Sequence, residues 1–101
     1  MRRVGQARKR DANEAQIVQA LRQCGASVIR LSEPGVPDLL VLFQRRLLLM
    51  EIKTARGRAT SAQDAKAREG WPSVTCRSIS DALGALEQVS RAMRAEGRTR
   101  C

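Results

Sequence analysis

Histidine is absent from the sequence. Its absence excludes Ser-His-Asp and Cys-His catalysis, metal ligation by imidazole, and the general base that enzymes use most often. Catalysis by this chain would therefore have to use carboxylates, lysine and a metal ion.

Cysteines, aromatic residues and long apolar runs are also scarce. Three cysteines without a CxxC pair argue against a disulfide framework and a zinc site, and they fit a reducing, cytoplasmic compartment. With one Phe and one Trp, the core must be built from aliphatic side chains, and stacking on single-stranded bases is a poor means of binding nucleic acid. No apolar run is long enough to span a membrane, and no signal peptide is visible at the basic N-terminus. The 101 residues predict a single domain with no membrane partner.

Positive charge is what the sequence has in excess, with a net charge of +9. Residues 91–101 carry four arginines against one glutamate, and the middle of the chain is nearly neutral. Basic ends favour an anionic polymer, above all nucleic acid, as partner, although they could serve solubility alone. We expect a flexible basic arm over 1–10, a folded domain over 11–96 and a basic tail over 97–101. The basic residues of the arm are Arg2, Arg3, Arg8, Lys9 and Arg10.

Apolar spacing and turn residues predict an α/β fold in the order helix, three strands, helix, strand, helix. Asp11 with Glu14 three positions later has the spacing of a capping box, which starts the first helix, and Gly25 ends it. The second and third strands are apolar on both faces, as in a sheet that is covered on both sides. The predicted elements are helix 11–24, strands 26–32, 38–43 and 47–53, a helix from Thr60 or Ser61 to about Glu69, strand 73–78, and a helix that opens at Ser80 or Asp81.

Charged residues within these apolar strands mark the candidate site. Glu51 and Lys53 are two residues apart on one strand, so they share a face. If the second and third strands form an antiparallel hairpin centred between Gln44 and Arg45, Asp38 falls directly opposite Glu51, with Cβ atoms about 5 Å apart. Gln-Arg is a poor two-residue turn because neither residue favours positive φ, but a four-residue loop with the same centre would preserve the pairing.

Two carboxylates held this close repel each other unless a proton or a cation lies between them. A hard divalent cation with oxygen ligands is the natural solution, and the carbonyl of Ile52 could add a neutral ligand beside Asp38 and Glu51. Lys53 would then orient or help to deprotonate a water, or stabilise charge on a phosphate. The alternative is a structural salt bridge of Lys53 with one of the two acids.

At these residues the sequence resembles the VRR-NUC family of the PD-(D/E)XK nuclease superfamily. Gly35-Val36-Pro37-Asp38 looks like the GxPD element of the family. A second element resembles the EVK…GR.S..Q pattern and consists of Glu51-Ile52-Lys53-Thr54, Gly57-Arg58, Ser61 and Gln63.

The resemblance implies a restriction-endonuclease-like αβββαβ core, in which a mixed four-stranded sheet is flanked by helices. It implies that Asp38 and Glu51 bind Mg²⁺ or Mn²⁺, that Lys53 is the catalytic lysine, and that Glu14 and Gln63 belong to the same site. Small phage and bacterial members of the family are similar to Holliday junction resolvases, which act as homodimers on branched DNA.

We therefore expect a metal-dependent DNA endonuclease, with structured DNA as its substrate. A DNA-binding protein without catalysis and a sequence-specific restriction-type duplex nuclease are the alternatives. Glu14 could serve only as a helix cap, and Gln63 could be an ordinary exposed helix residue. Arg56 and Arg58 could bind phosphates or simply be solvated.

Overall fold

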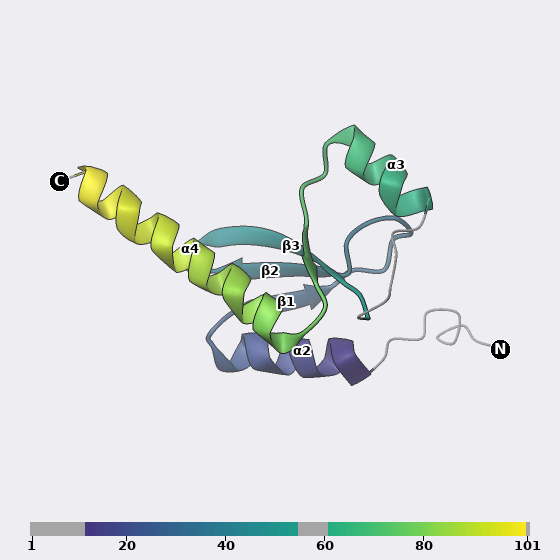
Figure 1. Ribbon diagram of the computed structural model, residues 1–101, viewed down its shortest axis with the longest axis horizontal. Helices are drawn as coiled ribbons and strands as arrows, with labels where there is room; N and C mark the ends of the chain where they lie inside the picture. Colours follow the sequence, from purple (N-terminus) through teal and green to yellow (C-terminus); the bar gives the residue numbers. More distant parts are fainter. Residues whose placement is uncertain (1–11, 55–60, 101) are drawn as a thin grey trace.

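The computed structural model describes residues 12–54 and 61–100. It confirms the α/β class and the predicted order of elements, with a mixed four-stranded sheet flanked by helices (Figure 1). The elements are α2 (Ala12–Gln23), β1 (Ser27–Arg30), β2 (Leu39–Phe43), β3 (Arg46–Ile52), α3 (Ser61–Glu69), β4 (Val74–Cys76) and α4 (Ile79–Arg100).

The sheet has the strand order β1-β2-β3-β4, with antiparallel pairs except for the parallel pair β3–β4. The predicted hairpin register is confirmed, since Phe43 pairs with Arg46 and Leu39 with Met50. Gln44 and Arg45 form the two-residue turn with φ angles of 51° and 67°. Both therefore adopt the left-handed conformation that Asn and Gly would adopt more easily. Pairing of the long strands thus imposes a turn that the local sequence does not favour.

One face of the sheet is covered by α2 and α4, which contact each other and lie along the same side of the strands (Figure 1). The aliphatic core lies between these layers and includes Ile17, Leu21, Leu39, Val41, Met50, Cys76 and Leu86, all of them buried. Helix α3 stands apart from the other two helices, at one end of the strands, and buries none of its own residues (Figure 1). It therefore adds little to the core.

The opposite face of the sheet is largely open, so the prediction that both faces are covered is wrong. Leu47 is 67% exposed, Ile29 56% and Leu42 44%. The register joins them across three strands through the half-buried Leu40 and Leu49. We call these five side chains the open sheet face.

The last helix begins earlier than predicted. The Asp81 amide donates to the Ser78 hydroxyl (3.1 Å), and the Asp81 carboxylate accepts from the Arg77 amide (2.8 Å). The first of these bonds makes Ser78 the N-cap, so α4 opens at Ile79 rather than at Ser80 or Asp81. The helix then continues to Arg100, past the expected domain limit at residue 96. No helix among the residues described has the length and apolar character needed to cross a membrane.

Candidate active site

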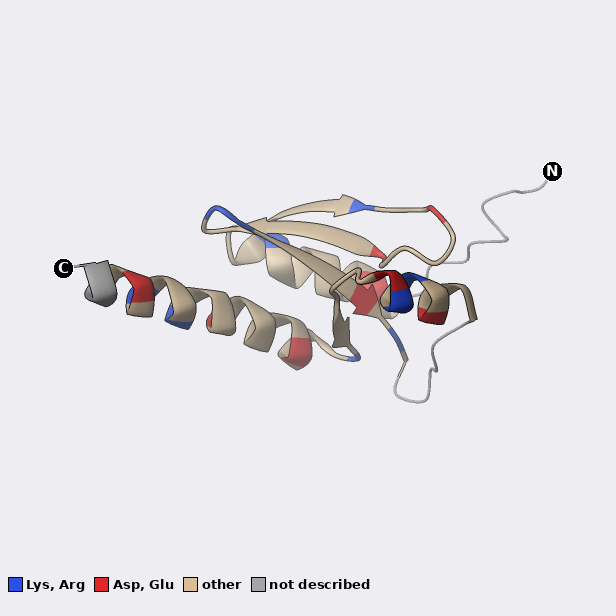
Figure 2. Ribbon diagram, turned by 90° about the horizontal axis from the view of Figure 1, so that it is seen from above, with Lys and Arg blue, Asp and Glu red and all other residues tan. Residues whose placement is uncertain are grey.

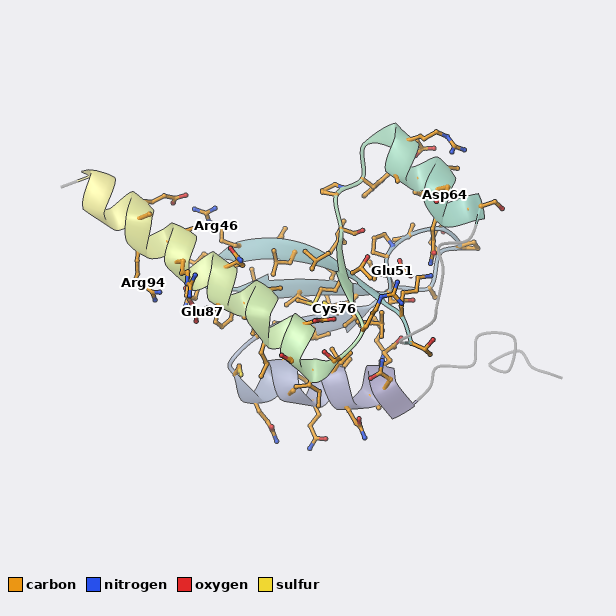
Figure 3. The ribbon with its side chains drawn as sticks, viewed as in Figure 1. Arg46, Glu51, Asp64, Cys76, Glu87 and Arg94 are labelled. Carbon is orange, nitrogen blue, oxygen red and sulfur yellow. The ribbon has the colours of Figure 1, made fainter. Side chains whose placement is uncertain are left out.

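Four of the five predicted catalytic residues, namely Asp38, Glu51, Lys53 and Gln63, converge at the end of the sheet nearest α3. Asp38 precedes β2, Glu51 lies near the end of β3, and Lys53 directly follows that strand. Gln63 comes from the first turn of α3. In Figure 3, Glu51 lies between the strand ends and α3, far from Arg46 at the other end of β3. A cavity of about 240 Å³ opens here and is lined by Glu51, Lys53 and Gln63, among others.

Asp38 and Glu51 form a close carboxyl pair. They flank the observed pair Leu39–Met50, which places them opposite each other as the hairpin register predicts. The Ile52 amide donates to Asp38 Oδ2 at 2.8 Å and holds that carboxylate. Burial raises the pKa of Glu51 to about 7; the nearby Asp38 charge and a hydrogen bond with Asp38 contribute, and Lys53 opposes the shift. Near neutral pH the pair therefore retains a proton unless a cation replaces it.

Lys53, Gln63 and Glu51 form a closed network of two hydrogen bonds and one ion pair. Lys53 Nζ donates to Gln63 Oε1 at 2.7 Å and lies 3.7 Å from Glu51 Oε2. The Gln63 side-chain amide donates in turn to Glu51 Oε2. Gln63 is thus not an ordinary exposed helix residue, because it fixes both charged groups. The salt bridge that was the alternative interpretation of Lys53 is present, with Glu51 as its partner.

Gly35 brings α3 to the sheet. It has a φ of +82°, and a Cβ at this position would lie 2.8 Å from the carbonyl oxygen of Ala62. The Leu31 amide donates to the Asp38 carbonyl at 2.8 Å and closes the loop that carries Gly35. This close backbone approach is at Ala62, directly before Gln63, whose side chain contacts Lys53 and Glu51.

The backbone of Lys53 is held from two sides. Its amide donates to the Cys76 carbonyl (3.0 Å), and its carbonyl accepts from Asn13 Nδ2 (3.2 Å). The start of α2 and the end of β4 therefore fix the position from which the lysine side chain extends. No sequence pattern points to Asn13, because its partner lies 40 residues away.

Glu14 is buried, and its Oε2 accepts a hydrogen bond from Arg30 Nε at 3.1 Å. It lies in the first turn of α2, but the capping partner Asp11 is outside the described residues. Glu14 is not among the described residues that line the cavity. The structure gives Glu14 a salt bridge to Arg30 of β1, and its place in the site stays a prediction, since Asp38 is not among the lining residues either.

The cavity is also lined by charged and aromatic residues that were not predicted from the sequence: Asp64, Lys66, Trp71 and Arg77. Lys66 could have been found, since it follows Gln63 by three residues on a helix and so shares its face. Arg77 Nη1 donates to the Thr54 carbonyl at 2.6 Å. Arg77 and Trp71 reach the site from the segments that flank β4, which local periodicity does not reveal.

The predicted DNA-binding residues all lie outside the described residues: Arg2, Arg3, Arg8, Lys9, Arg10, Arg56 and Arg58. In the part of the chain that is described, acidic residues gather where the strand ends meet α3 (Figure 2).

The donor set of the site fits a hard divalent cation. The described residues include no group of three or more acidic or cysteine side chains that could hold a metal. However, Asp38 and Glu51 supply two adjacent carboxylates. Burial and, second, the Asp38 charge raise the pKa of Glu51, and a bound cation would favour its ionised form. The Ile52 carbonyl lies on the Asp38 side of β3, because the amide and carbonyl of one strand residue point the same way.

No model of a known protein family matches the chain, and no curated protein matches its sequence. The resemblance to the VRR-NUC family therefore rests on the motif residues themselves.

Proposed function

We propose that this protein is a metal-dependent endonuclease that hydrolyses DNA phosphodiesters at the site formed by Asp38, Glu51, Lys53 and Gln63. The observation that carries the proposal is the Lys53–Gln63–Glu51 network next to a second carboxylate. A purely structural salt bridge to Lys53 would need only one carboxylate, whereas this site holds two carboxylates that repel each other. Such a pair beside a lysine is the arrangement expected for metal-assisted phosphodiester hydrolysis.

Asp38, Glu51 and the Ile52 carbonyl are the groups that would hold Mg²⁺ or Mn²⁺. When bound, such an ion supplies a lowered pKa for water and neutralises charge on a phosphate. The Ile52 amide keeps Asp38 in place for this role through its 2.8 Å hydrogen bond. Oxygen ligands and no histidine or thiolate favour these hard ions over zinc.

Lys53 is the group that would act on the substrate. Its ammonium is held by Gln63 and Glu51 at the cavity wall, where it can orient a water or stabilise charge on the scissile phosphate. Gln63 positions Lys53 and Glu51 together, because its amide uses both its oxygen and its nitrogen.

DNA as the substrate is supported by the net charge of +9, most of which lies near the two ends of the chain. We further propose that the substrate is branched or otherwise structured DNA and that the protein acts inside the cell; the likeness of the motifs to the VRR-NUC family supports this choice.

A cleavage assay tests the proposal. Wild-type protein is incubated with end-labelled four-way junction and linear duplex, with Mg²⁺, with Mn²⁺ or with EDTA. We expect cutting that requires the metal and falls at least about a hundredfold in Asp38→Asn. Asp64→Asn is the matched control, since Asp64 lines the same cavity but is not part of the acid pair. Cutting in EDTA, or equal loss in both variants, would contradict the proposal.

A homodimer is the second part of the proposal, and the open sheet face is its interface. Leu47, Ile29 and Leu42 present exposed apolar surface without a charged side chain among them. Two chains that each carry +9 repel, so a second copy is best placed against an uncharged surface. Asp38 and Glu51 lie on the same sheet face as these leucines, so the interface would be continuous with the site. Symmetric pairing would present two sites to two strands.

A further inference from the structure

Trp71 is the only tryptophan of the chain, and it stands at the candidate site. It is 47% exposed and lines the cavity together with Glu51, Lys53 and Gln63. Large aromatic side chains bury apolar surface where they can, so a half-exposed indole beside a polar cavity calls for an explanation.

Part of the explanation is structural. The Gly70 amide donates to the Ala67 carbonyl (3.0 Å) and the Trp71 amide to the Lys66 carbonyl (3.3 Å), which is the Schellman pattern that ends α3. The contact that accompanies this motif is made by Lys66, whose Nζ lies 6.0 Å from the centre of the indole ring. The motif requires the glycine and an apolar neighbour, but it does not require a tryptophan or explain an exposed ring.

The surroundings of the ring suit a nucleotide. The indole nitrogen is already engaged, since it donates to Glu69 Oε1 at 3.2 Å, and Lys66 Nζ lies over one face of the ring, so the ring offers chiefly its other face. The Lys66 ammonium pairs with Glu69 Oε1 at 3.6 Å, and its remaining N–H donors can contact a phosphate. A π-face next to a cation at the wall of the cavity matches the pairing of base stacking with backbone contact in single-strand binding sites.

On the basis of the nuclease function above, we propose that Trp71 stacks on an unpaired base of the DNA, so that the enzyme cuts beside unpaired nucleotides rather than within continuous duplex. A base inside a duplex is covered on both faces by its neighbours, so only an unpaired or extruded base can offer a face to the ring. The scarcity of aromatic residues, which argued against stacking, matters less than the place of this one at the site.

Intrinsic fluorescence tests the inference directly, because all tryptophan emission of the chain comes from Trp71. The full chain is titrated in EDTA with a matched duplex and with the same duplex carrying a single-stranded gap. We expect quenching by the gapped duplex and little change with the matched one. Trp71→Leu should bind the gapped duplex about tenfold more weakly, and Trp71→Phe should stay within about threefold of wild type. Ile79→Ala, which alters another partly exposed apolar residue that does not line the cavity, should bind as wild type does.

The outcomes separate the two proposals. Metal-dependent cutting of matched and gapped duplex at equal rates, with unchanged fluorescence, would overturn the stacking role and leave the nuclease intact. Selective quenching by the gapped duplex without cleavage under any metal would retain the stacking role and overturn the nuclease. If Trp71→Leu binds gapped and matched duplex as tightly as wild type while its melting curve is unchanged, the inference is wrong.

Discussion

Glu51 is the residue on which the chemistry of the site depends most. Its pKa of about 7 means that it exchanges a proton with solvent near neutral pH, whereas its ordinary value is 4.5. A divalent cation binds the ionised carboxylates, so below pH 7 it must displace this proton. We expect Mn²⁺ affinity to fall about tenfold per pH unit below 7 and to level off above it.

Titration calorimetry in buffers of different ionisation enthalpy measures this coupling. One unit below pH 7, binding should release about one proton from the protein, and one unit above it close to none. Glu51→Gln should lose the coupling together with most of the affinity. Metal affinity that is the same across this range would contradict the account of the acid pair.

The same pKa makes a prediction for stability without metal. The folded chain holds the Glu51 proton more tightly than the unfolded chain does. The contribution of this proton to the free energy of unfolding is therefore fully present below pH 4.5 and is lost as pH rises through about 7. Glu51→Gln removes this loss. In EDTA, we expect the variant to melt above wild type at pH 8 and the gap to narrow toward pH 5, as followed by circular dichroism. Glu69→Gln, which removes an exposed carboxylate of α3, is the control.

Asp38, Glu51 and Lys53 could be identified from the sequence because charges within apolar strands are costly, and because the hairpin register is set by an even spacing. The residues that were missed are fixed by contacts between distant segments. Asn13 reaches the Lys53 carbonyl from the first helix, and Trp71 reaches the cavity from a helix end. No local pattern encodes such contacts.

At the level of elements, the contact of the Gly35 loop with α3 can be tested with two glycine substitutions. Gly35→Ala would combine a strained positive φ with a clash against the Ala62 carbonyl, whereas Gly70→Ala would meet only the strain, since nothing lies within 4 Å of its Cβ position. We expect Gly70→Ala to cost about 1 kcal/mol and Gly35→Ala about 2–3 kcal/mol in urea unfolding.

The two glycine variants also separate stability from positioning. Displacement of α3 by Gly35→Ala should move Gln63 away from Lys53 and lower the cleavage rate at temperatures where the protein remains folded. Equal costs and equal rates for the two variants would show that the close approach to Ala62 has no role in holding the site.

The pairing of the hairpin strands was predictable from the sequence, whereas the open sheet face was not. The pairing of Phe43 with Arg46 followed from the apolar pattern, although Gln44 and Arg45 are poor turn residues. The covering of the sheet did not follow, because a strand that is apolar on both faces looks the same whether a helix or a second subunit covers it. That distinction lies outside the local sequence.

At the scale of the whole molecule, the order of elements was predictable from the sequence, and the proposed homodimer can be tested in solution. We expect a dimer in light scattering at micromolar concentration, and a monomer for Leu47→Lys, because a lysine would place like charges in the open sheet face. Ile79→Lys adds the same charge at an exposed position outside that face and should remain dimeric. Dimers of equal stability in both variants would exclude this face as the interface.

The central claim is that cleavage depends on Lys53 within the carboxylate network and not on positive charge in the cavity at large. Lys53 and Lys66 both line the cavity, but only Lys53 is tied to Gln63 and Glu51 by the described contacts. The most direct measurement is the single-turnover rate of DNA cleavage with saturating Mg²⁺ for Lys53→Ala and Lys66→Ala. The account predicts a loss of at least about a hundredfold for Lys53→Ala and at most about tenfold for Lys66→Ala. Undiminished cleavage by Lys53→Ala would contradict it.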